Sequence, residues 1–508
     1  MGEGQGEGEV EQNISRTSHK ILFFNTLAFI VCFAAWMLNG VLVSFLADNQ
    51  VFNWGPVEIG WLLGIPVLTG SLFRLPAGIL TDKYGGKWVF GLLLMICSIP
   101  MYFLSQANSF LSFALLSFGF GLVGTSFSIG IAYTSVWYPR KWQGTALGIF
   151  GAGNAGAAVT TLLAPTLLNR LTHAGTMLEG WRTLPKIYAA SLLMMGILFL
   201  IFTENKKSDH GQKSLVKLLA PLKQMRVWRF GLYYFLVFGC FVALSQWLVP
   251  YFLNVYSLSL VSAGIFASAF SLPSGLIRAL GGWSSDTWGA RRVMYWVLGL
   301  STLCCALLMV PRMEIFSPGA GVMAKRGGVV TSVSSNEIIV DEMKYPLLER
   351  PKTEEPANDK ILIFPTKEVW QESLVKPGDT VKKKQLLARG NTRIYFQANI
   401  WIAAGLIIIV GIVWGIGKAA VYKHIPEYFP SEVGVVGGMV GVLGGLGGFF
   451  SPIIFGYLLK ITGLWTSMWI FLSAVSVLCL WWMHRVIAKM THETAPQITD
   501  KMERSVEA

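Results

Sequence analysis

Long uncharged stretches alternate with short charged loops along this chain. Such stretches cover residues 21–47, 57–81, 88–139, 142–169, 187–203, 230–277, 293–311, 394–417, 433–459 and 461–483. The only charges inside them are Glu58 and Arg74, in the stretch 57–81. A helix needs about 20 apolar residues to cross the hydrocarbon of a bilayer. The polar segments "SQANS" at 105–109 and "NVYSLS" at 254–259 divide the two longest runs. The pattern therefore predicts twelve transmembrane helices.

The composition supports an all-α polytopic membrane protein. The chain has 508 residues, of which 53% are hydrophobic and 14% are charged, against roughly 25% charged in soluble domains. This balance excludes a soluble, disordered, collagen-like or disulfide-stapled protein. The net charge is +13, but the basic residues lie mostly in loops, so we expect a lipid bilayer as the partner and no nucleic acid.

The basic residues also predict the orientation in the membrane. With the N-terminus inside, the short inner loops hold fifteen Lys and Arg residues, Lys418 and Lys423 among them, and the outer loops hold four. Inner loops carry an excess of positive charge. We therefore expect an integral protein of the cytoplasmic (inner) membrane with both termini in the cytoplasm.

Residues 313–396 interrupt the membrane pattern. "GGVVTSVSSNEIIVDE" alternates like strands, and "KPGD" is typical of a turn. The segment "VKPGDTVKKKQLLARG" resembles a barrel-sandwich hybrid, the small all-β fold of biotinyl and lipoyl carriers. The modified lysine motif of those carriers is missing, so we interpret the insert as a structural appendage on the outer face.

These patterns divide the chain into six parts. They are a disordered head at 1–20, a six-helix bundle at 21–203, a linker at 204–229, a second six-helix bundle at 230–312 and 397–487, the β-rich insert at 313–396, and a tail at 488–508. We expect the head, linker and tail to be cytoplasmic.

Two motifs occur once in each predicted bundle. "RLPAGILTDKYGGK" at 74–87 is matched by "RALGGWSSDTWGARR" at 278–292, and "GIFGAGNAG" at 148–156 by "GVLGGLGGF" at 441–449. The first pair is offset by 204 residues (278 − 74) and the second by 293 (441 − 148). The difference of 89 (293 − 204) is close to the 84 residues of the insert (396 − 313 + 1). The chain thus contains two similar six-helix halves, the design of major facilitator transporters.

The charged loops of the first motif pair resemble the signature that follows the second helix in that superfamily. We expect them to form a cytoplasmic gate that latches the two halves together. Their residues are Gly78, Asp82, Lys83, Gly85 and Lys87 in the first half, and Gly282, Asp286, Gly289, Arg291 and Arg292 in the second.

Arg74 and Arg278 are two charges inside predicted spans. Arg74 precedes the loop residue Asp82 by eight residues, about 12 Å along a helix, whereas half the hydrocarbon is about 15 Å. Both arginines therefore lie near the midplane, where an arginine costs roughly 2.5–3.5 kcal/mol. No carboxylate stands at a similar depth in any predicted span. The pair predicts a mobile anion as substrate, because guanidinium presents paired donors to planar oxyanions.

Glycines crowd the second motif pair. They are Gly148, Gly151, Gly153 and Gly156 in the first half, with Asn154 among them, and Gly437, Gly438, Gly441, Gly444, Gly445, Gly447 and Gly448 in the second. Close helix packing explains part of this density. Helices this bare also slide, bend and bring a small ion close to the backbone.

Arginines in spans two and eight, together with "GIFGAGNAG" and "GGMVGVLGGLGGFFSP", resemble the nitrate/nitrite porter (NarK-type) family. The likeness covers nearly all of the chain except the insert and the tails. It implies that Arg74 and Arg278 clamp the anion and that Asn154 donates a hydrogen bond to it. It also implies site roles for the aromatic residues Tyr234, Phe238 and Phe127.

The resemblance implies alternating access, with nitrate or nitrite held between the two arginines. We expect nitrate/nitrite exchange rather than nitrate/proton symport, because His173 and His424 are predicted in loops and no titratable group is evident in the pore. Another small anion such as formate, oxalate or phosphate, and a membrane sensor that uses the insert, are the alternatives. No span carries a nucleophile–base pair or a metal motif, so we expect neither enzymatic activity nor a cofactor. We also expect the protein to be a monomer.

Overall fold

The computed structural model describes residues 15–207, 220–310, 313–350, 366–396, 398–429 and 433–494. They form two compact units. A helical unit runs to Met309 and resumes at Leu406, and a β-rich unit lies between Val310 and Gly405.

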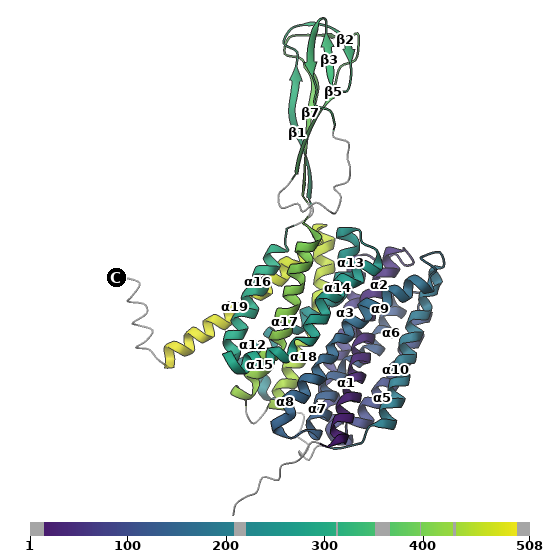
Figure 1. Ribbon diagram of the computed structural model, residues 1–508, viewed down its shortest axis with the longest axis vertical. Coiled ribbons are helices and arrows are strands. Elements are labelled where there is room, and N and C mark those ends of the chain that lie inside the picture. The colour runs from purple at the N-terminus through teal and green to yellow at the C-terminus, as the bar shows by residue number, and fades with distance from the viewer. Residues whose placement is uncertain are drawn as a thin grey trace, which may run out of the picture. The chain divides into compact units, whose positions relative to one another are not determined.

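Helices make up the whole of the first half of the helical unit (Figure 1). The helices are α1 (Arg16–Trp36), α2 (Leu38–Asp48), α3 (Pro56–Leu72), α4 (Arg74–Tyr84), α5 (Gly86–Phe103), α6 (Phe110–Phe120), α7 (Ser126–Trp137), α8 (Arg140–Gly151), α9 (Gly156–Leu171) and α10 (Thr183–Phe202). The predicted break at 105–109 is confirmed, since α6 begins at Phe110 behind a capping box between Ser109 and Ser112.

The second half repeats this plan around the insert. Its helices are α12 (Met225–Tyr234), α13 (Phe241–Tyr256), α14 (Leu260–Leu276), α15 (Arg278–Trp288), α16 (Ala290–Leu307), α17 (Ile400–Tyr428), α18 (Val433–Thr462) and α19 (Ser467–Thr494). Short irregular helices connect or interrupt several of them: η1 (Leu104–Gln106), η2 (Gly121–Thr125), η3 (Ala152–Ala155), η4 (Leu178–Arg182), η5 (Ala220–Lys223) and η6 (Phe235–Cys240).

The helical unit has the membrane-spanning character that the sequence predicts. Among the described residues, ten helical spans are long and apolar enough to cross a membrane, and the pair α14–α15, bent by 51°, makes eleven. Helix α16, with 18 residues and with Arg291 and Arg292 in its first turn, stands at the place of the remaining predicted span but is not among these.

The internal repeat is visible in the lengths of the helices. Both α3 and α14 have 17 residues, both α4 and α15 have 11, and both α5 and α16 have 18. A glycine with positive φ follows α4 and α15 alike, Gly85 at 89° and Gly289 at 84°. Only glycine adopts this conformation without strain, so the two charged loops turn in the same way.

The two halves meet mainly along three helix pairs, α2 with α13, α3 with α18 and α9 with α14, and α4 with α18 and α8 with α15 make further contacts. Where α3 begins and α18 ends, the backbones nearly touch, because a Cβ at Gly60 would lie 2.5 Å from the carbonyl oxygen of Pro452. Toward the opposite end of α18, a Cβ at Gly438 would find its nearest atom, from Leu75, at 3.7 Å, and one at Gly148 would meet nothing within 4 Å. The contact between the halves is therefore tight at one end and loose at the other.

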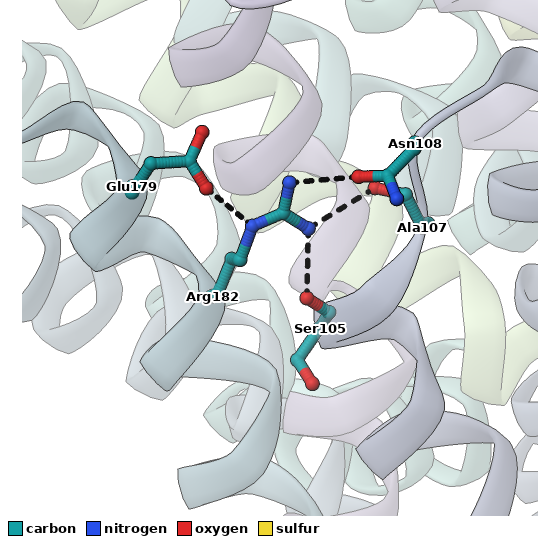
Figure 2. A network of polar contacts seen from close by, with 5 residues as sticks. All are labelled: Ser105, Ala107, Asn108, Glu179 and Arg182. Atoms are coloured by element: carbon teal, nitrogen blue, oxygen red, sulfur yellow. Dashed lines mark hydrogen bonds and ion pairs between the residues drawn. The ribbon is translucent and has the colours of Figure 1, made fainter.

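Arg182 shows how a structural arginine is held in this fold (Figure 2). Its guanidinium pairs with Glu179 and donates to the carbonyl oxygens of Ser105 at 2.9 Å and Ala107 at 3.3 Å, and to Oδ1 of Asn108 at 2.8 Å. These bonds satisfy the carbonyls that end η1 and tie η4 to the loop before α6.

The insert consists of strands, as predicted. Its strands are β1 (Met313–Met323), β2 (Gly328–Val333), β3 (Glu337–Val340), β4 (Met343–Pro346), β5 (Thr366–Ser373), β6 (Thr380–Val381) and β7 (Leu386–Phe396). They form a sheet of order β1-β7-β5 and a sheet of order β4-β3-β2-β6. Val330, Ile338, Tyr345 and Leu387 belong to its apolar core. Gly378, with φ of 95°, forms the predicted turn at "KPGD".

Candidate functional site

Each predicted site residue lies at an irregularity of a helix. Arg74 and Arg278 begin α4 and α15 directly after a break, and Phe127 follows the 3-10 turn η2. Asn154 lies in the 3-10 turn η3, and Phe238 lies in η6, a π-helical segment that begins after Tyr234. Such irregularities are frequent at functional sites. At Arg74 the cause is local, because Pro76 has no N–H with which to bond the carbonyl of Leu72.

The two arginines share one aromatic ring. The guanidinium carbon of Arg74 lies 5.4 Å from the ring centroid of Phe127, and that of Arg278 lies 5.2 Å from the same centroid. Arg74 also lies 5.0 Å from the ring of Phe238. The tertiary structure therefore brings together one arginine from each half, 204 residues apart in sequence (278 − 74).

Both arginines keep N–H groups that have no partner in the protein. Arg74 is 2% exposed, and its Nε and Nη2 have no hydrogen-bond acceptor, like Nη1 of Arg278. Among the described residues, no carboxylate lies within ion-pair distance of either guanidinium. A buried unsatisfied donor costs about 1–3 kcal/mol, and more when it is charged. Arg182, by contrast, has acceptors on all three nitrogens.

Aromatic side chains enclose this pair. The rings of Phe127 and Phe238 are stacked with centroids 6.1 Å apart, and Tyr234 stacks on Phe238 at 5.0 Å. The hydroxyl of Tyr234 is buried beside Arg278 and Tyr422 and forms no hydrogen bond of full geometry with either. These residues exclude water and leave a further donor facing the arginines.

Asn154 lies on the element that meets Arg278 across the two halves. The turn η3 packs against α14, where Gly275, one turn before Arg278, approaches Ala155. Asn154 is fully buried, and both its amide oxygen and its amide nitrogen lack a partner. It thus adds two unsatisfied polar atoms to this region.

The glycine motifs separate into groups by what surrounds them. Gly151 lies against Arg278, and Gly441 and Gly445 lie against Arg74, because a Cβ at these two positions would stand 3.7 and 3.4 Å from its Nη1. The glycines that give room to neighbouring helices are Gly153, Gly156, Gly444, Gly447 and Gly448, and Gly444 receives the ring of Tyr234. More space surrounds Gly148, Gly437 and Gly438.

Three polar contacts of the charged loops lie within one half. Nζ of Lys423 lies 2.5 Å from Oδ1 of Asp286, and Nη2 of Arg291 donates to the hydroxyl of Tyr428 at 2.6 Å. In the first half, Nδ2 of Asn205 donates to the carbonyl of Tyr84 at 3.0 Å. A latch between the halves stays a prediction.

Lys418 is one of the residues that the sequence analysis placed wrongly in a loop. It lies inside α17, which continues to Tyr428, and not in a loop, and it is fully buried. Its Nζ donates to Oγ of Ser274 at 3.1 Å and lies 3.1 Å from the ring centroid of Phe241. In "GIGKAAVY" the residues on both sides of Lys418 are apolar. This pattern could have indicated that the helix continues past the lysine. His424, predicted in a loop, is likewise buried in α17.

Two repeated helical halves that meet around unpaired buried guanidinium groups define a secondary transporter of the major facilitator class. The sequence model of the Major Facilitator Superfamily matches residues 24–340. The fold agrees with a bacterial homologue of the human lysosomal transporter Spinster (TM-score 0.61, 14% identity, 92% of this chain and 97% of that one). It also agrees with the nucleoside transporter NupG (TM-score 0.58, 13% identity, 92% and 99%).

Sequence relatives narrow the family. A probable nitrate/nitrite antiporter NarK1 of Thermus thermophilus is 37% identical over 95% of both chains. A nitrite extrusion protein of Bacillus subtilis (strain 168) is 26% identical over 92% of this chain and 96% of that one. A probable nitrate transporter NarT of Staphylococcus haemolyticus is 26% identical over 87% and 90%. The chain belongs to the nitrate/nitrite porter (NarK-type) family of the major facilitator superfamily.

Proposed function

We propose that this protein carries nitrate and nitrite across the membrane by alternating access, with the anion bound between Arg74 and Arg278. One observation carries the proposal: three buried guanidinium nitrogens of these arginines lack an acceptor, and no carboxylate among the described residues pairs with either side chain. The names of the relatives, nitrate/nitrite antiporter and nitrate transporter, support the same substrates.

The arrangement favours a small planar oxyanion. A guanidinium offers coplanar donors. The stacked rings of Phe127 and Phe238 provide flat apolar walls beside these donors. The hydroxyl of Tyr234 and the amide of Asn154 supply additional donors. Formate and oxalate share the planarity and are the competitors to test, whereas tetrahedral phosphate does not match flat aromatic walls.

The transport mode that we propose is exchange. Without an anion, Arg74 and Arg278 repel each other in a site of low dielectric constant, which opposes closure of the empty carrier. A bound anion removes this repulsion and lets the halves rock. The tight contact at Gly60 and the loose one at Gly438 are consistent with a carrier open at one end only.

Lys418 supports a second mode, nitrate/proton symport. The sequence argument for exchange assumed that no titratable group lies near the anion site. Lys418 is a titratable group, and it donates a hydrogen bond to Ser274 in α14, the helix that precedes Arg278. The protonation of a lysine is sensitive to its burial, so a buried lysine can serve as a proton carrier. Release of its proton would then accompany release of the anion.

Proteoliposomes separate these proposals. Uptake of labelled nitrate is measured with and without internal nitrite, each at matched pH and with an inward proton gradient. Exchange predicts uptake only with internal nitrite, and symport predicts uptake driven by the gradient alone. Competition by formate, oxalate and phosphate ranks the substrates, and nitrate or nitrite as weak competitors would contradict the assignment.

We also propose a monomer in the inner membrane, with both termini inside and the insert outside. The six native cysteines are buried, so an introduced cysteine reports its own location. In intact cells, a membrane-impermeant maleimide should label Ser335→Cys in the insert and not Thr287→Cys in the charged loop. Labelling of Thr287→Cys but not of Ser335→Cys would show that the protein has the opposite orientation.

A further inference from the structure

A second group of cations lies away from Arg74 and Arg278, in a pocket where α12, α16, α17 and α19 meet. We call it the cationic pocket. One wall consists of the basic and aromatic residues Arg229, Phe230, Tyr233, Arg291, His424 and Tyr428. Met483 and Ile487 of α19 stand in its apolar wall. It lies at the end of the bundle that carries the repeated charged loops, because α16 begins and α17 ends there.

Two buried polar side chains of this pocket have atoms without a partner. Arg229 is 7% exposed and has no acceptor for its Nε, and Tyr233 is 2% exposed with an unpaired hydroxyl. His424 is 4% exposed and stacks on Phe230 with centroids 5.6 Å apart, and its Nδ1 faces the carboxylate of Glu427. Buried polar groups are ordinarily paired, so the unpaired Arg229 and Tyr233 in one pocket point to a ligand.

The charges around the pocket are predominantly positive. The guanidiniums of Arg226 and Arg291 lie 5.1 and 6.0 Å from the ring centroid of Tyr428. Among the described residues, the only carboxylate within ion-pair distance of the pocket's basic groups is that of Glu427, 3.6 Å from Nδ1 of His424 and about half exposed. Three arginines therefore face one acidic group, and the pocket selects an anion.

We propose that the cationic pocket binds a phosphate-type oxyanion, with Arg229 and Arg291 as its principal ligands. Arginine forks match phosphate oxygens, and the hydroxyl of Tyr233 completes the donor set. Phosphate reaches such a site as a free ion or as the headgroup of an anionic lipid. The apolar wall from α19 suits the acyl chain of a lipid, and basic pockets between transmembrane helices bind lipid headgroups.

The test uses the purified full-length protein in a neutral detergent and measures its thermal unfolding midpoint. Three probes are titrated: inorganic phosphate, glycerol 3-phosphate, and short-chain phosphatidylglycerol, with short-chain phosphatidylcholine as the zwitterionic reference. The variants are Arg229→Gln and Arg291→Gln. Arg291 is exposed on the surface, so its variant folds even where the Arg229 variant does not. Arg485→Gln is the matched control, a cation on α19 that does not line the pocket.

The expected result is stabilisation of the wild type and of Arg485→Gln by an anionic probe. The apparent affinity should be about tenfold weaker in Arg291→Gln, the loss of one charge-assisted hydrogen bond. Stabilisation by phosphatidylglycerol alone identifies a lipid, and equal stabilisation by phosphate identifies a free ion. The proposal is overturned if no anionic probe exceeds phosphatidylcholine, or if Arg485→Gln loses as much affinity as Arg291→Gln.

Discussion

Arg74 donates a hydrogen bond from Nη1 to the carbonyl oxygen of Gly441 at 2.6 Å, across 367 positions of sequence and between the two halves of the protein. The bond fixes one nitrogen of the guanidinium and leaves Nε and Nη2 unpaired. The arginine is therefore held in place by the glycine-rich helix α18 while its other donors stay available to an anion. Because this bond joins the two halves, a rocking movement that separates α4 from α18 breaks it. Arg74 therefore couples anion binding to the movement of the halves.

Arg278→Lys tests the planar donor set. Lysine keeps the charge but loses the fork, and a hydrogen bond to a charged group contributes about 1.5–3 kcal/mol. We expect nitrate affinity to fall about tenfold to a hundredfold with an unchanged unfolding midpoint, measured by binding and uptake. Arg485→Lys is the control. Unaltered nitrate affinity in Arg278→Lys would show that charge alone suffices.

Phe127→Leu tests the ring that both guanidiniums share. Leucine keeps an apolar side chain but has no π face, and each cation–π contact contributes about 0.5–2 kcal/mol. We expect nitrate to bind about tenfold more weakly. Phe90→Leu removes a buried ring of the same half and should reduce stability but not affinity. Equal affinity in the two variants would remove Phe127 from the site.

Gly444→Ala and Gly438→Ala form a matched pair on α18. A Cβ at Gly444 would overlap the ring of Tyr234, whereas one at Gly438 would make an ordinary contact of 3.7 Å with Leu75. We expect Gly444→Ala to abolish most uptake by displacing Tyr234, and Gly438→Ala to transport normally. Nitrate uptake by the two variants is compared at equal expression. Similar uptake by both would show that transport does not depend on the position of Tyr234.

Lys418→Met tests the coupling. Methionine fills a similar volume, keeps an apolar contact with Phe241 and carries no proton. Exchange of nitrate for internal nitrite should persist in this variant, while any stimulation of uptake by an inward proton gradient should vanish. A gradient response as large as that of the wild type would exclude Lys418 as the proton carrier.

Removal of the insert tests whether transport needs it. Arg74, Arg278, Phe127 and Tyr234 all lie in the helical unit. A chain in which a short flexible linker replaces residues 313–396 should therefore transport nitrate in proteoliposomes at a similar rate per molecule. Loss of transport by a chain that remains folded would show that the insert takes part in transport.

The amino-acid sequence alone predicted the order of the helices, the internal repeat, the β-rich insert and the two arginines. These features are local: an apolar run determines a span, and a charge inside it has an energetic cost wherever the helix packs. The equal lengths of α4 and α15 and the paired turns at Gly85 and Gly289 follow from residues that stand next to one another in the chain.

Only the tertiary structure decided which groups meet. Sequence spacing assigned Lys418 and His424 to loops, whereas α17 continues beyond them and buries both. It also predicted that the loops with Asp286 and Arg291 latch the two halves together, whereas these two residues bond to α17 of their own half. The physical reason is that a side chain's partners come from helices distant in sequence. A helix's length, rotation and neighbours are set by packing over the whole bundle, and the local pattern records only its apolarity.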